Sequence, residues 1–295
     1  MLLHLLDSVE ALDATRKVVI VGSGKDQLEA AVAGTGCTIA VQEPQLGTGH
    51  AVQQAEDALA GFDGDVLILY GDVPFVPADT MRAMLDRLGQ ADQPAVVVLG
   101  FEPADGLHYG RVIASADGRI EKMVEFKDAT PAERDCRLCN SGLMAIRSQD
   151  LFALLSRVGK DNAAGEYYLV DIVNIAIADG RSCAVITTDP FDVAGINSRA
   201  ELAEMEGQWQ ARRRQRAMAE GATLVAPETV WFSHDTRIGR DVLIDEQHVG
   251  EDNVGPRDVG TAGRRGPRIA EVRRGVEAQV EAGQLGGEPR LELVG

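Results

Sequence analysis

A run of apolar residues that ends in Gly-Asp-Val-Pro constrains the fold of this chain more than any other stretch. Residues 65–70 read Asp-Val-Leu-Ile-Leu-Tyr and run directly into Gly71, Asp72 and, two positions later, Pro74. Five consecutive apolar or aromatic residues, too few for a helix, predict a strand that is buried on both faces, as a parallel sheet requires. Gly71 lets the backbone turn and Pro74 prevents further ladder pairing, so we expect the Asp72 carboxylate at the carboxyl edge of the sheet.

Asp72 has two interpretations. Ligands of open α/β sheets bind at the carboxyl edge of the strands. A carboxylate at that edge suits Mg²⁺, which prefers oxygen ligands and usually arrives with phosphate. The alternative is a loop residue that only caps the next helix. The segment by itself leaves both interpretations open.

Strands and helices alternate along the first two thirds of the chain. This alternation predicts right-handed βαβ units and a Rossmann-like α/β fold with a mixed, mainly parallel sheet. Residues 109–113 and 120–126 flank Ala-Asp-Gly, which predicts a hairpin. The other predicted strands are 17–22, 37–41, 65–70, 95–101, 138–146 and 183–186, and the predicted helices are 1–12, 26–33, 50–59, 78–88, 147–158 and 165–176.

The pattern changes after residue 197. Ser198 is expected to cap a long helix, and residues 238–245 carry an aliphatic residue every six positions, which is typical of a left-handed parallel β-helix. Further along, the aliphatic step falls to five and then loses any period. The predicted parts are a large α/β domain at 1–197, a linker helix at 198–220, a first β-helix coil at 221–245 and an irregular, poorly ordered tail at 246–295.

Charge and composition exclude several classes of protein. The formal net charge of −17 predicts that the surface repels nucleic acid, so any anionic substrate requires local cations, a metal or helix amino ends. No apolar run is long enough for a membrane span and no signal-peptide pattern is present. Four scattered cysteines are too few for a disulfide framework. We therefore expect a cytoplasmic protein.

Seven motifs in one order resemble a known family. They are QEPQLGTGHAVQQA (42–55), LYGDVPF (69–75), YGRV (109–112), VEFKDAT (124–130), CNSGLMA (139–145), GEYYLVDIV (165–173) and GINSRAELA (195–203). Together they resemble the uridylyltransferase domain of bifunctional N-acetylglucosamine-1-phosphate uridylyltransferase/glucosamine-1-phosphate acetyltransferase. The resemblance covers about residues 1–245 and implies a sheet of the nucleotide-diphospho-sugar transferase type.

The resemblance implies a role for individual residues. It implies that Asp72 and Asn197 hold Mg²⁺, and that the remaining site residues bind the substrates, UTP and N-acetylglucosamine 1-phosphate. These are Gln42, Gly47 and Thr48 for the uracil, Tyr70 and Gly71 for the nucleotide, and Gly110, Glu125 and Asn140 for the sugar. Asn197 is also expected among the substrate-binding residues.

The chemistry of these residue types agrees with the implied roles. The amide of Gln42 can both donate to and accept from the pairing edge of uracil, while Glu125 and Asn140 can bond sugar hydroxyls and an acetamido group. Each residue also has a structural alternative. Asn140 is alternatively a strand-end turn former, Glu125 a surface charge and Thr48 a helix cap.

The implied reaction transfers a uridylyl group from UTP to N-acetylglucosamine 1-phosphate, giving pyrophosphate and UDP-N-acetylglucosamine, a precursor of peptidoglycan and lipopolysaccharide. The family begins with a strand and then a loop resembling L-A-A-G-x-G-T-R-M, which supplies catalytic cations. That motif does not occur here, and residues 22–25 (Gly-Ser-Gly-Lys) resemble it only superficially. We therefore assign no catalytic cation, expect impaired activity, and expect a sheet that lacks its first strand and exposes apolar edges.

Three hypotheses remain open. The first is an enzyme of this multifunctional family, whose acetyltransferase β-helix is lacking here beyond one coil. The second is a non-catalytic remnant that keeps the fold. The third is a nucleotidyltransferase for another sugar or base. Members of the family form homotrimers through the β-helix, so a chain with one coil is expected to be a monomer or to aggregate.

Overall fold

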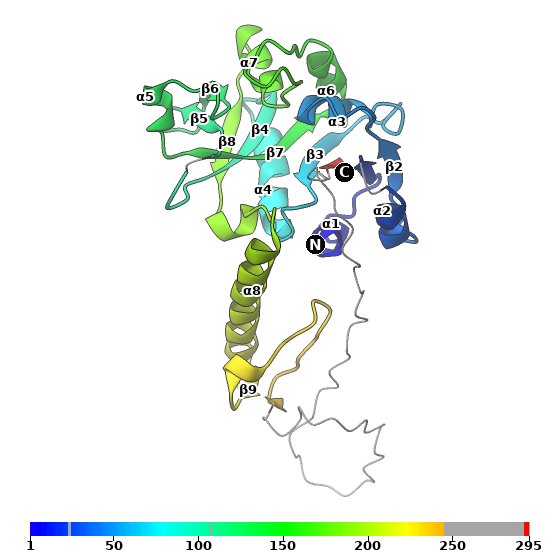
Figure 1. Cartoon of the computed structure of the whole chain (residues 1–295), viewed down its shortest axis with the longest axis vertical. Helices are drawn as coiled ribbons and strands as arrows, with labels where there is room; N and C mark the ends of the chain where they lie inside the picture. The colour runs from blue at the N-terminus through cyan, green and yellow to red at the C-terminus, as the bar shows by residue number, and fades with distance from the viewer. Residues whose placement is uncertain (23–24, 107, 245–291, 295) are drawn as a thin grey trace, which may run out of the picture. The chain divides into compact units, whose positions relative to one another are not determined.

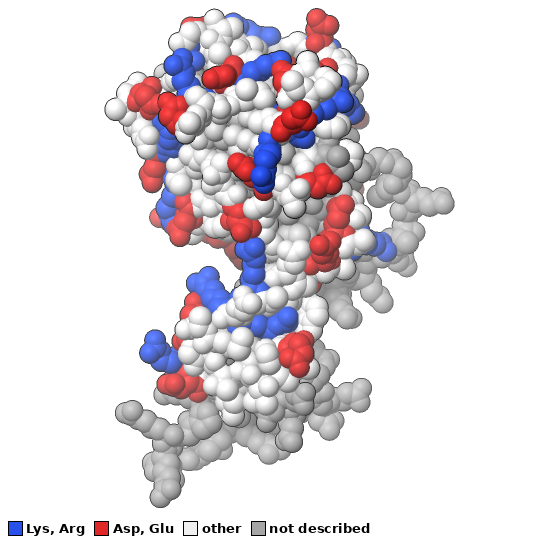
Figure 2. Space-filling view, turned by 90° about the vertical axis from the view of Figure 1, so that its left-hand side faces the viewer, with Lys and Arg blue, Asp and Glu red and all other residues white. Residues whose placement is uncertain are grey.

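The computed structural model describes residues 1–22, 25–106, 108–244 and 292–294 (Figure 1). The chain divides into two compact units, one made of Met1–Gly195 with Gly287–Gly295, the other of Ile196–Gly286. None of the described helices has the length and hydropathy needed to cross a bilayer. On the face drawn in Figure 2, acidic and basic side chains of the larger unit are interspersed.

A nine-stranded mixed sheet forms the centre of the larger unit. Its main path runs β2-β1-β11-β3-β7-β4-β8, and the hairpin of β5 and β6 joins it through β7. The strands are β1 (Val18–Val21), β2 (Thr38–Val41), β3 (Asp65–Tyr70), β4 (Val96–Phe101), β5 (Arg111–Ala114), β6 (Ile120–Val124), β7 (Cys139–Arg147), β8 (Ala184–Thr187) and β11 (Glu292–Val294).

Strand directions correct one part of the prediction. The sheet is mixed, as predicted, and β1, β2, β3, β4 and β8 all run in the same direction. However, among the described strands of this sheet only β1 with β2 and β4 with β8 are parallel neighbours, because β7 and β11 run in the opposite direction between the others. "Mainly parallel" is therefore correct for the strand directions and wrong for the pairing.

Helices cover both faces of the sheet. α1 (Leu2–Glu10), α2 (Lys25–Val32) and α4 (Ala78–Leu88) cover one face, and α3 (Thr48–Gln53), α6 (Ser148–Leu155) and α7 (Asp171–Ala178) cover the other. The short helices α5 (Pro131–Arg134) and η1 (Pro190–Val193) lie in connections.

The central strand β3 contributes to both hydrophobic layers. Val66 and Ile68 belong to the layer with α3, whereas Leu67 and Leu69 belong to the layer with α1 and α4. All four side chains are at most 5% exposed. The prediction of a strand buried on both faces is confirmed, and at about 25 cal/mol per Å² of apolar area this burial is a main stabilising contribution of the sheet.

The neighbours of β3 differ from the prediction. We expected an opened sheet beside β3, but β11 lies there, antiparallel to both β1 and β3 (red in Figure 1). The pattern of residues 246–295 gave no indication of this strand. Residues 245–291 and 295 lie outside the described part of the chain, so the prediction of a poorly ordered tail stays a prediction there.

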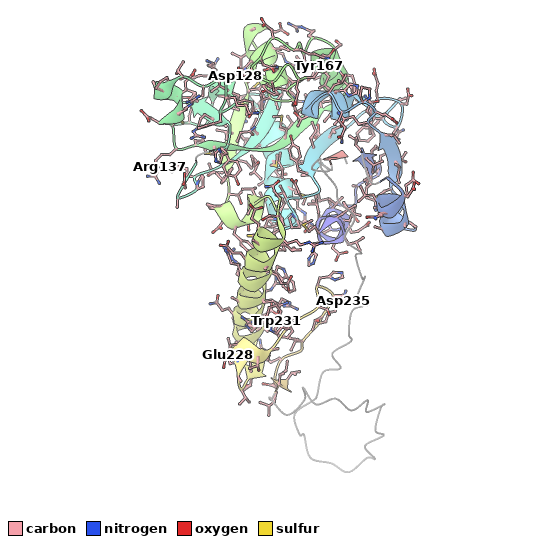
Figure 3. The ribbon with its side chains drawn as sticks, viewed as in Figure 1. Asp128, Arg137, Tyr167, Glu228, Trp231 and Asp235 are labelled. Atoms are coloured by element: carbon pink, nitrogen blue, oxygen red, sulfur yellow. The ribbon has the colours of Figure 1, made fainter. Side chains whose placement is uncertain are left out.

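The second unit contains a long helix and a pair of short parallel strands. Ser198 caps α8 (Arg199–Ala219), as predicted, through a capping box in which Glu201 N–H donates to the Ser198 side chain at 3.1 Å. β9 (Thr223–Leu224) and β10 (Leu243–Ile244) pair in parallel, with η2 (Pro227–Thr229) between them. In this loop Trp231, labelled in Figure 3, is 57% exposed. A role of α8 as a linker to a β-helix remains a prediction.

Gly142 in β7 supplies a test of the packing against β3. Its φ is +88°, and an added Cβ would lie 2.2 Å from the Tyr70 ring. We expect Gly142→Ala to lower the free energy of unfolding by about 2 to 4 kcal/mol, because backbone strain and overpacking add. Gly180→Ala is the matched control, since Gly180 has φ +77° with no atom within 4 Å of an added Cβ. Urea unfolding of both variants checks this, and equal losses would contradict the predicted ring clash.

Candidate functional site

A pocket of about 480 Å³ opens at the carboxyl edge of β1 and β2. Its lining comes from the segment after β2, from α3 and from two later loops. The lining residues are Ile20, Gln42, Gln45, Gly47, Thr48, Ala51, His108, Glu125, Phe126, Lys127, Ala164, Glu166 and Tyr168. The sequence predicted four of these as ligand contacts, namely Gln42, Gly47, Thr48 and Glu125.

The amide of Gln42 has one fixed orientation. Gln42 is 8% exposed and lines the pocket. Its Nε2 donates to the carbonyl oxygen of Gly47 at 2.9 Å and lies 3.2 Å from Nδ1 of His50. The reverse orientation would place two acceptors, Gln42 Oε1 and Gly47 O, against each other. The bond to Gly47 O thus fixes which end of the amide is the nitrogen, and Oε1 of Gln42 is the acceptor end.

The pKa of His50, which lies beside this amide, is lowered. Partial burial lowers the pKa of His50 below its ordinary value of 6.5, and the Lys160 ammonium lowers the pKa further. The His50 ring stacks on Tyr167 with centroids 6.1 Å apart, and Lys160 Nζ lies 4.6 Å from the centroid of the same Tyr167 ring. Both ring nitrogens of His50 face amide nitrogens, Nδ1 that of Gln42 at 3.2 Å and Nε2 that of Gln54 at 3.3 Å, so a neutral ring can accept from one of these two amides at a time.

The Gly-Thr loop is fixed by backbone contacts to the segment before α7. Gly49 N–H donates to Tyr167 O at 2.8 Å, and Tyr167 N–H donates to Leu46 O at 2.9 Å. Thr48 Oγ1 accepts from Leu169 N–H at 3.0 Å, so Thr48 links two segments and does not cap its own helix. These contacts also explain why α7 begins at Asp171, later than the predicted position 165.

Gly47 permits this close approach of the two segments. Its φ is +113°, and an added Cβ would lie 2.6 Å from Tyr167 O and 2.9 Å from Tyr167 N. Only glycine fits this position without moving the backbone. The predicted role of Gly47 therefore has a structural basis in the loop itself.

The three residues predicted for the sugar lie together. Asn140 N–H donates to Gly110 O at 2.9 Å, and an added Cβ on Gly110 would lie 3.3 Å from Glu125 Oε2. Asn140 is 8% exposed, and its Oδ1 accepts from Gly142 N–H at 2.9 Å. Within the described residues the Asn140 Nδ2 group makes no protein hydrogen bond. The Asn140 side chain thus both forms a local turn, as the structural alternative required, and keeps a donor available.

Tyr70, Gly71 and Asp72 follow one another at the carboxyl end of β3. The Tyr70 ring packs against Gly142, and Val73 N–H donates to Tyr70 O at 3.0 Å to form the predicted turn. Gly71 is buried and Asp72 is half-buried. Asn197 belongs to the second unit, where its backbone N–H donates to Glu201 Oε2 at 2.6 Å. Its pairing with Asp72 remains a prediction.

Several lining residues were missed by the sequence analysis. Lys127, Glu166 and Tyr168 all line the pocket. Burial raises the pKa of the Tyr168 phenol and the carboxylates of Asp128, Glu125 and Glu166 raise it further, so this phenol remains a donor. Asp128 and Tyr167, labelled in Figure 3, lie at the same end of the larger unit. The sequence did indicate Lys127, Glu166 and Tyr168 as candidates, because they fall inside the motifs VEFKDAT and GEYYLVDIV.

The Gly-Ser-Gly-Lys segment is described only in part. Ser23 and Gly24 lie outside the described residues. Gly22 is in contact with Gln45, because an added Cβ would lie 2.0 Å from Gln45 Nε2. Whether this segment binds phosphate stays a prediction.

The lowered pKa of His50 predicts a pH dependence of stability. The unfolded chain binds the His50 proton more tightly than the folded chain, so the stabilising contribution is present above pH 6.5 and is lost as the pH falls below that value. The variant His50→Asn keeps an acceptor near Nδ1 but does not titrate. We expect its Tm to fall less than the Tm of the wild type when the pH is lowered from 7.5 to 5.5. His234→Asn, at an exposed position, is the control and should behave as the wild type. Identical slopes for all three proteins would refute this role of His50.

Comparison with known proteins identifies the family. Residues 1–167 match the model of the MobA-like NTP transferase domain. A protein named bifunctional protein GlmU from Sphingopyxis alaskensis is 73% identical over 245 residues, and one from Novosphingobium aromaticivorans is 69% identical over 246 residues. Each alignment covers 83% of this chain and 54% of the relative, so the chain spans about half the length of these relatives. The resemblance found in the sequence is confirmed.

Solved structures share the fold at low identity. A nucleoside-diphosphate-sugar pyrophosphorylase from Vibrio cholerae superposes with a TM-score of 0.52 at 16% identity, covering 68% of this chain and 85% of that one. A UDP-glucose pyrophosphorylase complexed with UDP-glucose gives 0.52 at 19% identity, covering 72% and 87%. The larger unit thus has a nucleotide-sugar pyrophosphorylase-like α/β fold with a mixed sheet. Because the family model matches more than half of its length, the chain belongs to the family of MobA-like NTP transferase domains.

Proposed function

We propose that this chain acts on UTP and N-acetylglucosamine 1-phosphate, with Mg²⁺, and forms UDP-N-acetylglucosamine and pyrophosphate. The single observation that carries this proposal is the fixed amide of Gln42 in the pocket wall. Family membership supports nucleotidyl transfer in general. The choice of N-acetylglucosamine 1-phosphate as the acceptor follows the motif resemblance described in the sequence analysis.

The Gln42 amide favours a base with an N–H at its pairing edge. Gln42 Nε2 donates to Gly47 O, so Oε1 is the acceptor that this side chain can offer to a base. Uracil presents its N3–H donor to such an acceptor, whereas N3 of cytosine is itself an acceptor and would be repelled. The sequence predicted that the Gln42 amide both donates to and accepts from the base. In this orientation we propose that it meets the base with its acceptor oxygen.

The sugar end of the proposed site uses one donor and one acceptor. Asn140 is only 8% exposed, and its Nδ2 has no hydrogen-bond partner among the residues that the structure describes, so an acetamido carbonyl would satisfy this donor. The Glu125 carboxylate can accept from sugar hydroxyls, and Gly110 leaves room beside it, since an added Cβ would approach Glu125 Oε2 to 3.3 Å. An acceptor without an N-acetyl group would leave the Asn140 donor unsatisfied.

The metal is argued from the chemistry of Asp72. Asp72 offers carboxylate oxygens at the carboxyl end of β3, which suits Mg²⁺ held by one or two protein oxygens and by substrate phosphates. Within the described part of the chain, no group of three or more His, Cys, Asp and Glu side chains is placed to hold a metal ion. Asn197 is the proposed second oxygen ligand. When bound, Mg²⁺ would neutralise charge on the phosphates.

In the proposed reaction the main task of the protein is to align the two substrates. A phosphate oxygen of the sugar 1-phosphate attacks the α-phosphorus of UTP, and the bond from that phosphorus to the bridging oxygen breaks as pyrophosphate leaves. Gln42 and the Gly-Thr loop would hold the base, while Asn140 and Glu125 would hold the sugar, so that the attacking and leaving oxygens lie in line. Lys127 adds a cation to the pocket lining.

A pyrophosphate-release assay tests the proposal. UTP, Mg²⁺ and N-acetylglucosamine 1-phosphate should give turnover above the level without enzyme, and CTP, GTP, dTTP and glucose 1-phosphate run beside them define specificity. For the 295-residue chain as it stands we expect slow turnover, because the motif L-A-A-G-x-G-T-R-M with its cations does not occur in the sequence. Binding without any turnover would favour a non-catalytic remnant, and equal rates with other bases would favour a transferase of different specificity.

Gln42 gives a specific test of base selection. We expect Gln42→Leu, which keeps the volume but removes the acceptor, to weaken UTP binding about tenfold and to reduce the preference for UTP over CTP to near one. Equilibrium binding by calorimetry measures both. Gln53→Leu is the matched control. Gln53 Nε2 donates to Leu155 O, and Gln53 is not one of the residues that line the pocket. An unchanged preference in Gln42→Leu would remove Gln42 from the recognition of the base.

Asp72 gives the corresponding test of the metal. We expect Asp72→Asn to remove most of the Mg²⁺-dependent gain in UTP affinity, because a neutral amide is a weaker ligand for a hard cation than a carboxylate. UTP titrations with and without Mg²⁺ measure the gain. Asp79→Asn is the control, since the Asp79 side chain is 94% exposed and pairs with Arg82 on α4. A full Mg²⁺-dependent gain in Asp72→Asn would exclude this carboxylate from the metal site.

A further inference from the structure

A slot one strand wide lies in the middle of the sheet, between β1 and β3. β1 and β3 run in the same direction and are not paired with each other, since β11 pairs with both of them. Val18, Val19 and Ile20 pair on one side, and Ile68, Leu69 and Tyr70 pair on the other. More than 200 residues of chain separate the occupant of the slot from both neighbouring strands.

The slot sets strict conditions on its occupant. The position between Val19 and Leu69 belongs to the hydrophobic layer of α1 and α4, and the position between Val18 and Ile68 belongs to the layer of α3 and α6. An empty slot would leave two rows of backbone N–H and C=O groups without ladder partners inside the sheet. The occupant must therefore be extended and apolar at two consecutive positions. Leu293 and Val294 stand at these positions.

We propose that the space between β1 and β3 is a strand-acceptor site, and that its occupant is the segment Glu292–Val294 of the same chain. The site recognises an extended peptide by main-chain hydrogen bonds on both edges and by apolar side chains toward both layers. A separate peptide with the sequence of residues 287–295, GEPRLELVG, binds in the same place when the chain's own segment is disabled. This inference does not depend on the proposed transferase activity.

A cavity marks the part of the site that β11 does not fill. About 210 Å³ of space is lined by Leu67 and Leu69 of β3, by α1 and by the segment before β1. β11 pairs only with residues 68–70 of β3, and the antiparallel register runs from Val294 toward Leu67 and Val66. In the described residues, 65–67 therefore have a ladder partner on the β7 side only. A longer occupant would reach this cavity.

The first experiment tests the position of the segment in the full chain. Val19 and Leu293 are register partners, so the double variant Val19→Cys/Leu293→Cys should form a disulfide within one chain under mild oxidation. Val19→Cys/Leu285→Cys is the control and should not form it, because Leu285 is eight residues away from Leu293. Non-reducing electrophoresis and peptide mapping read the result. A crosslink between two chains would instead mean that a second copy supplies the strand, and no crosslink would contradict the proposed occupant.

The second experiment opens the site and refills it. Leu293→Pro removes a ladder donor from β11, so hydrogen exchange in peptides that cover residues 17–22 and 65–70 should become at least tenfold faster. Leu285→Pro is the matched control and should exchange as the wild type. Adding GEPRLELVG to Leu293→Pro should restore slow exchange in both peptides, whereas the same peptide with proline in place of its second leucine should not.

Two results with Leu293→Pro would overturn the proposal, one from hydrogen exchange and one from peptide binding. Wild-type exchange in Leu293→Pro would mean that β11 does not protect β1 and β3. Equal binding of labelled GEPRLELVG to the wild type and to Leu293→Pro would mean that the peptide binds elsewhere. If Leu293→Pro does not fold, shown by circular dichroism, the crosslinking experiment in the otherwise native chain decides alone.

The cavity makes the prediction for the peptide quantitative. A peptide extended by Val-Leu-Val after the last glycine should bind Leu293→Pro about tenfold more tightly than GEPRLELVG, because one more apolar side chain becomes buried. The same extension by Ser-Asn-Ser supplies the control for length. Fluorescence anisotropy of the two labelled peptides measures the ratio, and equal affinities would exclude the cavity from the strand-acceptor site.

Discussion

The fold of the larger unit depends on pairing both edges of the buried strand β3. Each backbone N–H and C=O group in a sheet that is covered on both faces needs a partner, since water does not reach it. β7 satisfies one edge of β3 through Asp65–Ile68, and β11 satisfies part of the other edge through Ile68–Tyr70. The two hydrophobic layers, the carboxyl edge with its loops and the turn at Gly71 all take their positions from this strand.

The pocket is built on the same principle, with backbone contacts fixing polar side chains. The Gly-Thr loop is joined to the segment at Tyr167 by main-chain hydrogen bonds, and Gly47 permits that approach. The same Gly47 carbonyl, together with His50, fixes the orientation of the Gln42 amide. Selection of a base would therefore be a property of the loop as a whole, because the side chain that would contact the base is itself oriented by its neighbours.

The sequence predicted the local elements well and their pairing less well. The run 65–70, the hairpin and the Ser198 cap follow from patterns within a few residues, and the structure has them. The antiparallel insertion of β7 and the position of β11 depend on residues far apart in sequence, which no local pattern encodes. Thr48 shows the same limit at the site, because its partner Leu169 N–H is 121 positions away. Tyr168 and Lys127 were within recognised motifs and were missed because their motifs were interpreted as strand and helix signals.

The place of β11 in the sheet also affects the order of folding. β1 and β3 are translated early, yet the strand between them follows more than 200 residues later. Contacts of such sequence separation carry a high entropic cost of loop closure and slow the folding of a chain. During synthesis the facing edges of β1 and β3 would remain open to other extended segments. Nascent chains of this protein should therefore require chaperones that shield strand edges until the late segment arrives.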